Sequence, residues 1–147
     1  MTSTSLAARA PTRAKRRALC LALSLLLVAI PAFAGSYLNR SSFLIRQATQ
    51  EGDYLRAHFA DRELALVVHK LAITRLEAAS RMEIPKEVVQ AHPHLLLMLE
   101  NYERSAEAAT EGKAERFMVY QQRARDEERT FRGVLKQLGF TLPGSDK

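Results

Sequence analysis

The sequence predicts an all-α protein, an antiparallel bundle of three long helices preceded by an N-terminal signal peptide. Three observations support this prediction. Apolar residues recur at intervals of three and four over long stretches, which is the period of an amphipathic helix. Proline and glycine lie between the stretches, where helices end. No stretch alternates between apolar and polar residues as a half-buried strand does.

The first 34 residues have the three-part pattern of a secretory signal peptide. Met1–Arg17 contains five basic residues and no acid, Ala18–Ile30 is an apolar run of 13 residues, and Ala32–Ala34 supplies the small residues of a cleavage site. We therefore expect cleavage after Ala34 and a periplasmic or secreted protein. A membrane-spanning helix needs about 20 apolar residues, so an uncleaved anchor is the second interpretation. The Arg16-Arg17 pair leaves the twin-arginine export route open beside the general one.

Removal of this segment changes the charge balance of the protein. Five of the 22 basic residues and none of the 16 acidic residues lie before Ala34, which leaves 17 basic against 16 acidic residues. The basic pI near 9.8 therefore belongs mostly to the signal peptide, and we expect no nucleic-acid partner. Cys20 is the single cysteine and lies in the same segment, so the exported chain has neither a disulfide nor a thiolate ligand.

The bundle itself is expected at residues 42–140, after a polar lead-in at 35–41. Its first helix is predicted over Ser42–Ser80, with Ser41 and Ser42 as candidate N-caps. Gly52 interrupts this helix at a cost of about 1 kcal/mol, but the apolar register continues across it. The alternative is a break at Gly52 with Asp53 as the cap of the following helix, which gives four helices instead of three.

The segment Asp61–Arg81 is unusually rich in apolar residues. They form a surface much wider than the seam of a coiled coil: Leu64, Val67, Val68, Leu71 and Ala78 in one group, and Leu66, Ile73 and Leu76 beside them. Three helices are too few to cover such a surface completely. We therefore expect it to accept a helix of another envelope protein or of a second copy, which makes a homodimer possible.

The remaining helices are bounded by proline and glycine. Pro85 ends the first helix, and Pro85–Gln90 is expected as a short helical turn. The second helix is predicted over Pro93–Thr110, with proline in the first position where its missing N–H costs nothing. The alternative treats Pro93 as a kink in a helix that begins at Pro85.

Gly112 is predicted to end the second helix in a left-handed conformation. The third helix follows over Ala114–Leu138 and ends at Gly139, beyond which Phe140 is expected to fold back on Leu135. Residues 141–147 are expected to form a flexible tail. The short connection makes these two helices antiparallel.

Charged residues line the second and third helices. The acids are Glu100, Glu103, Glu107 and Glu111, and the bases are Arg125, Arg129, Arg132 and Lys136. One interpretation is a pair of charged strips that bind a partner. The favoured interpretation is pairing within the protein, across the hairpin and within each helix, where an exposed pair contributes about 0–1 kcal/mol.

Four residues are candidate metal ligands. His92 and His94 are two residues apart, which directs both imidazoles the same way in extended backbone, and His69 and Glu127 fall in the apolar register of their helices. Each has a structural interpretation as well: His92 as a helix cap, His94 as an exposed residue, His69 as a core residue bonded to a neighbour. Glu127 would then pair with Arg75.

No enzyme motif accompanies these residues. The Glu-x-x-His spacing of di-iron bundles, hydrolase nucleophile motifs and phosphate-binding glycine loops do not occur. The sequence therefore predicts an exported, non-enzymatic protein-binding or adaptor module of the cell envelope that needs no cofactor. The alternative is a periplasmic bundle that binds a transition metal or haem through histidine.

Overall fold

The chain is helical through nearly all of the part that the structure describes. The structure is a computed structural model that describes the backbone of residues 13–144 and the side chains of residues 34–144. Within these residues it contains four α-helices, one short 3-10 helix and no strand, which confirms the predicted all-α class there: α1 (Arg13–Ala57), α2 (Arg62–Ser80), η1 (Lys86–Val88), α3 (His92–Thr110) and α4 (Ala114–Gln137).

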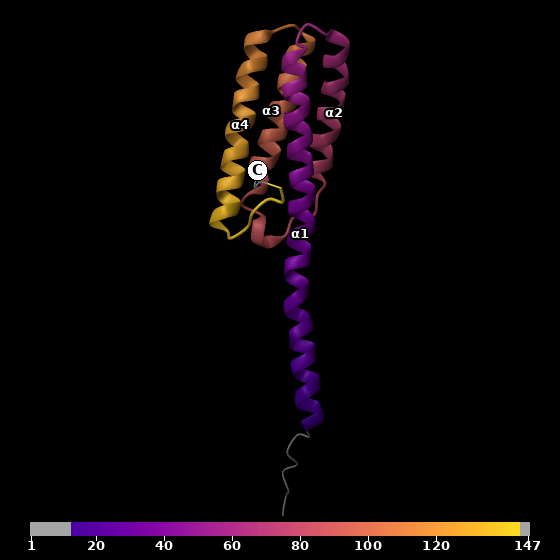
Figure 1. The fold of residues 1–147 in the computed structure, drawn as a ribbon, viewed down its shortest axis with the longest axis vertical. Helices are drawn as coiled ribbons and strands as arrows, with labels where there is room; N and C mark the ends of the chain where they lie inside the picture. Colours follow the sequence, from indigo (N-terminus) through magenta and orange to yellow (C-terminus); the bar gives the residue numbers. More distant parts are fainter. Residues whose placement is uncertain (1–12, 145–147) are drawn as a thin grey trace, which may run out of the picture. The chain divides into compact units, whose positions relative to one another are not determined.

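The chain divides into two units, and Ala34–Lys147 is the second. In this unit residues 34–57 of α1 and the helices α2, α3 and α4 lie side by side, and consecutive helices run in opposite directions (Figure 1). The predicted signal peptide and its cleavage after Ala34 fall almost wholly outside the residues whose side chains are described. They stay predictions.

The predicted continuous helix from Ser42 to Ser80 is wrong, because the chain turns between Ala57 and Arg62. Asp61 is the reason: its backbone is extended (φ −82°, ψ 99°). Its carboxylate accepts a hydrogen bond at 2.9 Å from the N–H of Leu64, which would otherwise lack a partner in the first turn of α2. Phe59 anchors the turn by packing against Phe117, with ring centroids 5.2 Å apart.

The proposed break at Gly52 is also wrong. Gly52 lies inside α1, and Asp53 does not cap a helix but lies 2.7 Å from Arg125 on α4. A Cβ atom on Gly52 would come within 2.7 Å of Gln121 Nε2 and 2.8 Å of the Tyr102 ring. The glycine therefore lets two side chains approach the backbone of α1, and its helix continues.

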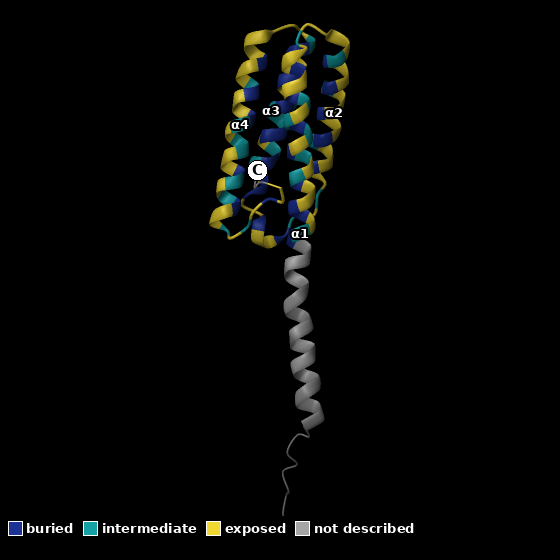
Figure 2. Ribbon diagram, viewed as in Figure 1, coloured by how far each residue is buried: buried dark blue, intermediate teal, exposed yellow. Residues whose placement is uncertain are grey.

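The buried side chains of the bundle form two clusters, which lie on the inner sides of the helices (Figure 2). The first, here called the large-residue core, contains Tyr37, Ile45, Leu95, Met98, Leu99, Phe131 and Leu135 among its fifteen members. The second, the alanine core, lies near the α1–α2 turn. Four of its seven members are alanine: Leu55, Ala65, Val68, Ala106, Ala108, Ala109 and Phe117.

A polar layer separates the two cores. The amide of Gln121 donates to the carbonyl of Gly52 at 3.1 Å, and the guanidinium of Arg75 donates to Glu51 at 2.5 Å. Arg75, Gln121 and Ser105 are all more than nine-tenths buried. They line a space of about 10 Å³ together with residues of both cores. These two hydrogen bonds fix the alignment of α2 and α4 against α1, whereas Ser105 Oγ of α3 makes no hydrogen bond to the described residues.

The ends of the unit differ from the predicted lead-in and tail. Residues 35–41 belong to α1, with Tyr37 and Ser41 buried, so Ser41 and Ser42 are not N-caps. After α4, Gly139 has φ +83° and Phe140 N–H donates to Leu135 O at 2.9 Å, as predicted. The segment beyond it is not a free tail, because Leu142 is buried against the large-residue core. Residues 145–147 of the predicted tail lie outside the described range.

The helical turn and the helices expected after Pro85 are confirmed. The 3-10 helix falls within the short turn predicted at Pro85–Gln90, and α4 ends one residue before the predicted Leu138. Pro93 lies in the first turn of α3 and does not kink a longer helix. Gly112 has φ +71°, and Lys113 N–H donates to Ala108 O at 2.9 Å, which closes the predicted helix end.

Candidate functional site

His69 connects α2 to α3. Its Nε2 lies 2.7 Å from a carboxylate oxygen of Glu103, and both side chains are about one-fifth exposed. A histidine and a carboxylate at this distance form a hydrogen bond that becomes an ion pair when the ring is protonated. The prediction that His69 is bonded to one neighbour agrees with this contact, but the residue lies at the edge of the α2–α3 contact and not in the core.

His94 and Glu127 are the two candidate metal ligands that the structure brings together. His94 Nδ1 lies 2.9 Å from Glu127 Oε2, so the pair joins α3 to α4. Glu127 does not contact Arg75, whose guanidinium is held by Glu51. Among the described residues there is no group of three or more His, Cys, Asp or Glu side chains able to hold a metal ion.

His92 takes a third position, at the base of α3. It is buried in the first turn and does not cap the helix. Its Nδ1 lies 3.1 Å from the hydroxyl of Tyr37 on α1. Burial lowers the pKa of His92 from its ordinary value, because the charged ring loses its hydration. The same burial raises the pKa of Tyr37.

The ion pairs expected across the α3–α4 hairpin form only beside its turn, where Glu111 lies 3.3 Å from Arg116 of α4 and 2.9 Å from Lys113. Arg125 instead pairs with Asp53 on α1, and Glu103 with His69 on α2. Three further pairs lie within a single helix: Glu100 with Arg104, Asp126 with Arg129, and Glu128 with Arg132. The predicted pairing within each helix is therefore confirmed, and pairing across the hairpin is confirmed only at the turn.

The outward side of α2 carries four of the ten exposed large apolar side chains among the described residues. The side chains that α2 buries are Ala65, Val68, Ala72, Arg75 and Ala79. Four large apolar side chains of the predicted surface remain exposed, at 51% for Leu66, 55% for Val67, 47% for Leu71 and 41% for Ile73. The sequence analysis identified these residues but not that the smaller alanines would take the interior.

A polar line divides this surface into two strips. Glu63, Lys70 and Glu77 are exposed and seven residues apart, so they follow one side of the helix. His69 contacts Glu103 and so marks the side of α2 that faces α3. With a rotation of 100° per residue, Leu66 and Ile73 lie on that side of the polar line, and Val67 and Leu71 lie on the other side. We call these residues together the outer face of α2.

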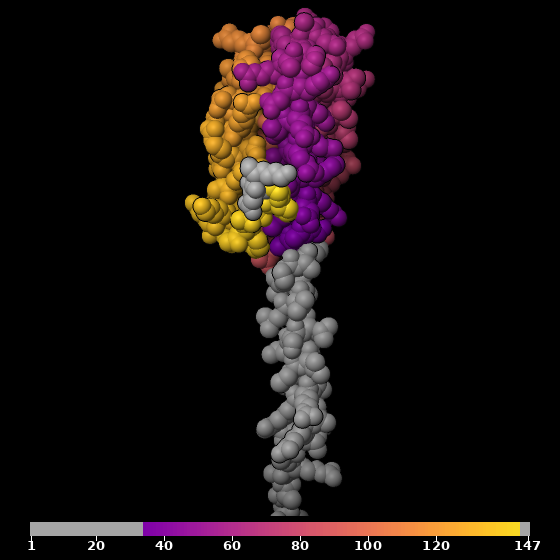
Figure 3. Space-filling model, viewed as in Figure 1, coloured from indigo at the N-terminus to yellow at the C-terminus, as the bar shows by residue number. Residues whose placement is uncertain are grey.

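A groove lies between α1, α4 and the segment that follows α4. Its volume is about 220 Å³, and its lining residues are Ser42, Ile45, Arg46, Thr49, Gln50, Glu128, Arg132, Pro143 and Gly144. In the space-filling view, α1 and α4 meet along one side of the unit, with the C-terminal segment against them (Figure 3). Sequence reasoning missed this site because its residues come from three segments up to 101 positions apart, such as Ser42 and Pro143.

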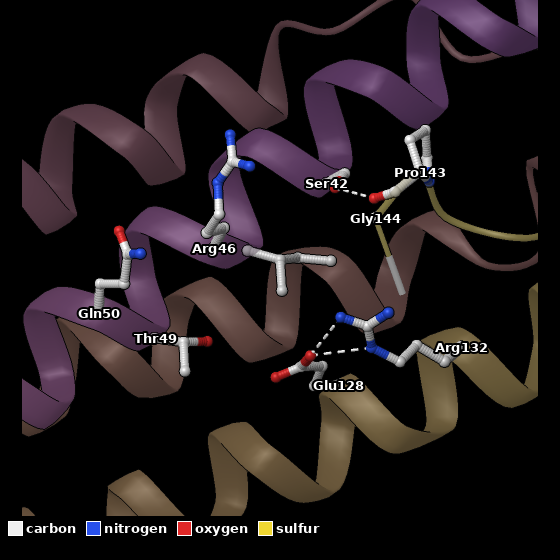
Figure 4. A pocket seen from close by; sticks show the side chains of 9 residues that line it. Ser42, Arg46, Thr49, Gln50, Glu128, Arg132, Pro143 and Gly144 are labelled. Atoms are coloured by element: carbon white, nitrogen blue, oxygen red, sulfur yellow. Dashed lines mark hydrogen bonds and ion pairs between the residues drawn. The ribbon is translucent and has the colours of Figure 1, made fainter. Parts of the chain in front are cut away.

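The groove is polar at its sides and apolar at its base. Ser42, Arg46 and Gln50 line it from α1, and Glu128 and Arg132 from α4 (Figure 4). The Ser42 hydroxyl donates to the carbonyl of Pro143 at 2.8 Å, which ties the C-terminal segment to α1. Beneath them lies Ile45, which is buried in the large-residue core.

Two findings concern the chain more broadly. Within the part of the chain that the structure describes, no helix combines the length and apolarity needed to cross a membrane. Comparison with protein-family models, curated proteins and solved structures finds no match to the chain. The observations that bear on function are therefore the histidine pairs, the outer face of α2 and the groove.

Proposed function

We propose that this chain is an exported, non-enzymatic helical bundle that acts as a protein-binding module of the cell envelope, with the outer face of α2 as its docking surface. The exposure of Leu66, Val67, Leu71 and Ile73 within eight consecutive residues carries this proposal. Four large apolar side chains this close together keep much apolar area in water. Covering that area is favourable by about 25 cal/mol per Å².

The occupant that this surface fits is the outer face of α2 in a second copy. The polar line alternates in sign, from Glu63 to Lys70 to Glu77. When two copies of α2 lie antiparallel, a twofold axis midway between Lys70 and either glutamate places each lysine beside that glutamate of the other copy. The apolar strips then flank two ion pairs. A twofold axis uses the same surface on both copies, as most homodimers do.

Export and the lack of an enzymatic role rest on the sequence. The basic, apolar and small-residue parts of the first 34 residues match a signal peptide. No nucleophile, acid–base or phosphate-binding motif accompanies the exposed apolar surface. A surface that recognises another helix needs none of these groups, because shape and apolar contact supply its affinity.

Sedimentation velocity tests the proposal on protein expressed from the full-length chain and purified after export. We expect a reversible monomer–dimer equilibrium in the micromolar range. The double variant Val67→Lys/Leu71→Lys should be monomeric, because it places four lysines at the dimer contact. Met118→Lys/Val119→Lys is the matched control: it makes the same change at exposed apolar residues of α4 and should dimerise normally.

Two outcomes would contradict the proposal. One is a wild-type protein that stays monomeric up to high micromolar concentration. The other is an equal loss of dimer in both double variants, because this would place the contact elsewhere. Circular dichroism of each variant checks that its helices remain folded. The intact mass of the same wild-type sample tests cleavage after Ala34.

A further inference from the structure

The groove between α1, α4 and the C-terminal segment contains two arginines, and one of them, Arg46, has no ion-pair partner among residues 34–144. Among the described residues no carboxylate pairs with Arg46, whereas the guanidinium of Arg132 is held on the opposite side of the groove by Glu128. Arg132 donates from Nε at 2.9 Å and Nη2 at 2.7 Å to the same oxygen, Glu128 Oε1. Its Nη1 group keeps its hydrogens free for another acceptor.

The two arginines differ in direction. In Figure 4 the Arg46 side chain points away from Arg132, whose guanidinium extends toward Glu128. Arg46 is exposed, so its side chain can rotate into the groove at the small cost of changing rotamers. An anion placed between the two residues would receive hydrogen bonds from both.

Neutral donors surround the same position. The Thr49 hydroxyl accepts a hydrogen bond from Tyr102 at 3.4 Å, so its own hydrogen remains available to a ligand. The amide of Gln50 lies next along α1 (Figure 4). The base and one end of the groove are apolar, formed by Ile45 and Pro143. The groove thus offers hydrogen-bond donors to one end of a ligand and apolar contact to the other.

Charge and size narrow the class of ligand. Two guanidinium groups and the Glu128 carboxylate give the groove one net positive charge, which a singly charged anion neutralises. Its volume of about 220 Å³ corresponds to roughly seven volumes of about 30 Å³, the share of one water molecule in the liquid. We propose that the groove binds a small organic monocarboxylate, with its carboxylate between Arg46 and Arg132 and its apolar part against Ile45 and Pro143.

This binding site is separate from the docking surface proposed on α2, and its test does not depend on dimerisation. The probe is butanoate, a monocarboxylate with a short apolar chain. It is titrated into the ¹⁵N-labelled exported protein at constant ionic strength, and amide chemical shifts are followed by NMR. We expect saturable shifts confined to Ser42, Thr49, Gln50, Arg132 and Gly144.

The affinities of matched arginine variants for butanoate distinguish binding in the groove from nonspecific electrostatic attraction to the protein. Arg46→Gln should weaken butanoate binding by about tenfold, which corresponds to about 1.4 kcal/mol, because it removes one charge-assisted hydrogen bond. Arg46→Lys keeps the positive charge but loses the planar guanidinium group. Its affinity for butanoate should therefore lie between those of wild type and Arg46→Gln. Arg40→Gln removes the same charge from an exposed position of α1 outside the groove and should leave affinity unchanged.

Three outcomes would overturn the proposal: shifts that rise without saturation, equal weakening by Arg40→Gln and Arg46→Gln, or equal affinity for butanoate, chloride and inorganic phosphate. The last would show that charge alone attracts the anion and that the apolar base contributes nothing. Because Arg46 is exposed, Arg46→Gln should remain folded, and the dispersion of its NMR spectrum verifies this in the same experiment.

Discussion

The two cores of the bundle solve the packing of four helices in different ways. The large-residue core fills the space between helices with leucine, methionine and aromatic side chains. The alanine core instead relies on four alanines from α2 and α3, packed with Leu55, Val68 and Phe117. Helices that meet through alanine can approach more closely, since the distance between helix axes depends on the side chains at the contact.

Small residues also account for the outer face of α2. Ala65, Ala72 and Ala79 recur every seven residues and occupy the buried side of α2, where Ala65 belongs to the alanine core and Ala79 to the large-residue core. With these alanines toward the neighbouring helices, Leu66, Val67, Leu71 and Ile73 point outward, whereas Val68 is buried. The alanine seam and the exposed apolar surface are thus two consequences of one orientation of the helix. The comparison teaches that the most apolar side of a helix need not be its buried side.

Replacing one phenylalanine in each core tests the difference in packing between the two cores, and it has the largest expected effect on the free energy of unfolding. Phe117→Ala and Phe131→Ala should each lower the free energy of unfolding by about 3–5 kcal/mol. Phe117→Ala should cost more, because four of the six other members of its core are alanines with no flexible side chain to move into the cavity, whereas the core of Phe131 contains Met98 and several leucines that can. Urea denaturation of both variants measures this. An equal or smaller cost at Phe117 would contradict the proposed difference between the cores.

Gly52 tests the polar layer between the cores. Gly52→Ala places a Cβ atom 2.7 Å from Gln121 Nε2 and 2.8 Å from Tyr102. Such overpacking costs about 1–3 kcal/mol, partly offset by a gain of about 0.5–1 kcal/mol in helix propensity. We expect a net loss of about 1 kcal/mol in the free energy of unfolding.

Gly133→Ala is the matched control for this substitution. Gly133 is also helical, but a Cβ atom there meets nothing within 4 Å. Only the gain in helix propensity should affect the free energy of unfolding, so this variant should be more stable than wild type by about 0.5–1 kcal/mol. If Gly52→Ala proves equally stabilising, close packing at the polar layer is not the reason for the glycine.

His92 tests the end of the large-residue core, with the smallest expected effect. Burial lowers its pKa in the folded protein from the ordinary 6.5. The unfolded chain therefore binds a proton at this position more readily than the folded protein does. As a result, the contribution of His92 to the free energy of unfolding is lost as the pH falls below about 6.5. We expect the stability of wild type relative to His92→Phe, from urea denaturation, to decline on acidification. A constant difference between wild type and His92→Phe across the acidic range would contradict the role assigned to burial.

Much of the fold was predictable because helix boundaries are encoded locally. Pro93 and Gly112 act through their own backbone angles and mark the beginning and end of α3. The end of α1 was missed even though Asp61, followed by an acid in the first turn of α2, carries a local N-cap signal. The apolar register runs through that position without interruption, and periodicity alone therefore favoured a single helix.

The candidate sites were less predictable than the fold. His69, His94 and Glu127 were predicted as candidate site residues, but their contacts were not. His69 contacts Glu103, 34 residues away in sequence, and His94 contacts Glu127, 33 residues away. Arg46 was not predicted as a site residue, because an exposed arginine on a helix is common. Only its position in the same groove as Arg132 and Pro143 distinguishes it. Proximity between segments is a property of helix rotation and alignment, which no local pattern encodes.

Local patterns in the sequence predict a helical protein, the positions where most of its helices begin and end, and the residues apolar enough to require cover. The packing of the helices adds which side of α2 is buried, which carboxylates His69 and His94 contact, and that α1, α4 and the C-terminal segment enclose a groove. The physical reason is that backbone preferences act within a few residues. Burial depends on how well the surfaces of neighbouring helices fit, and here the small residues fit best.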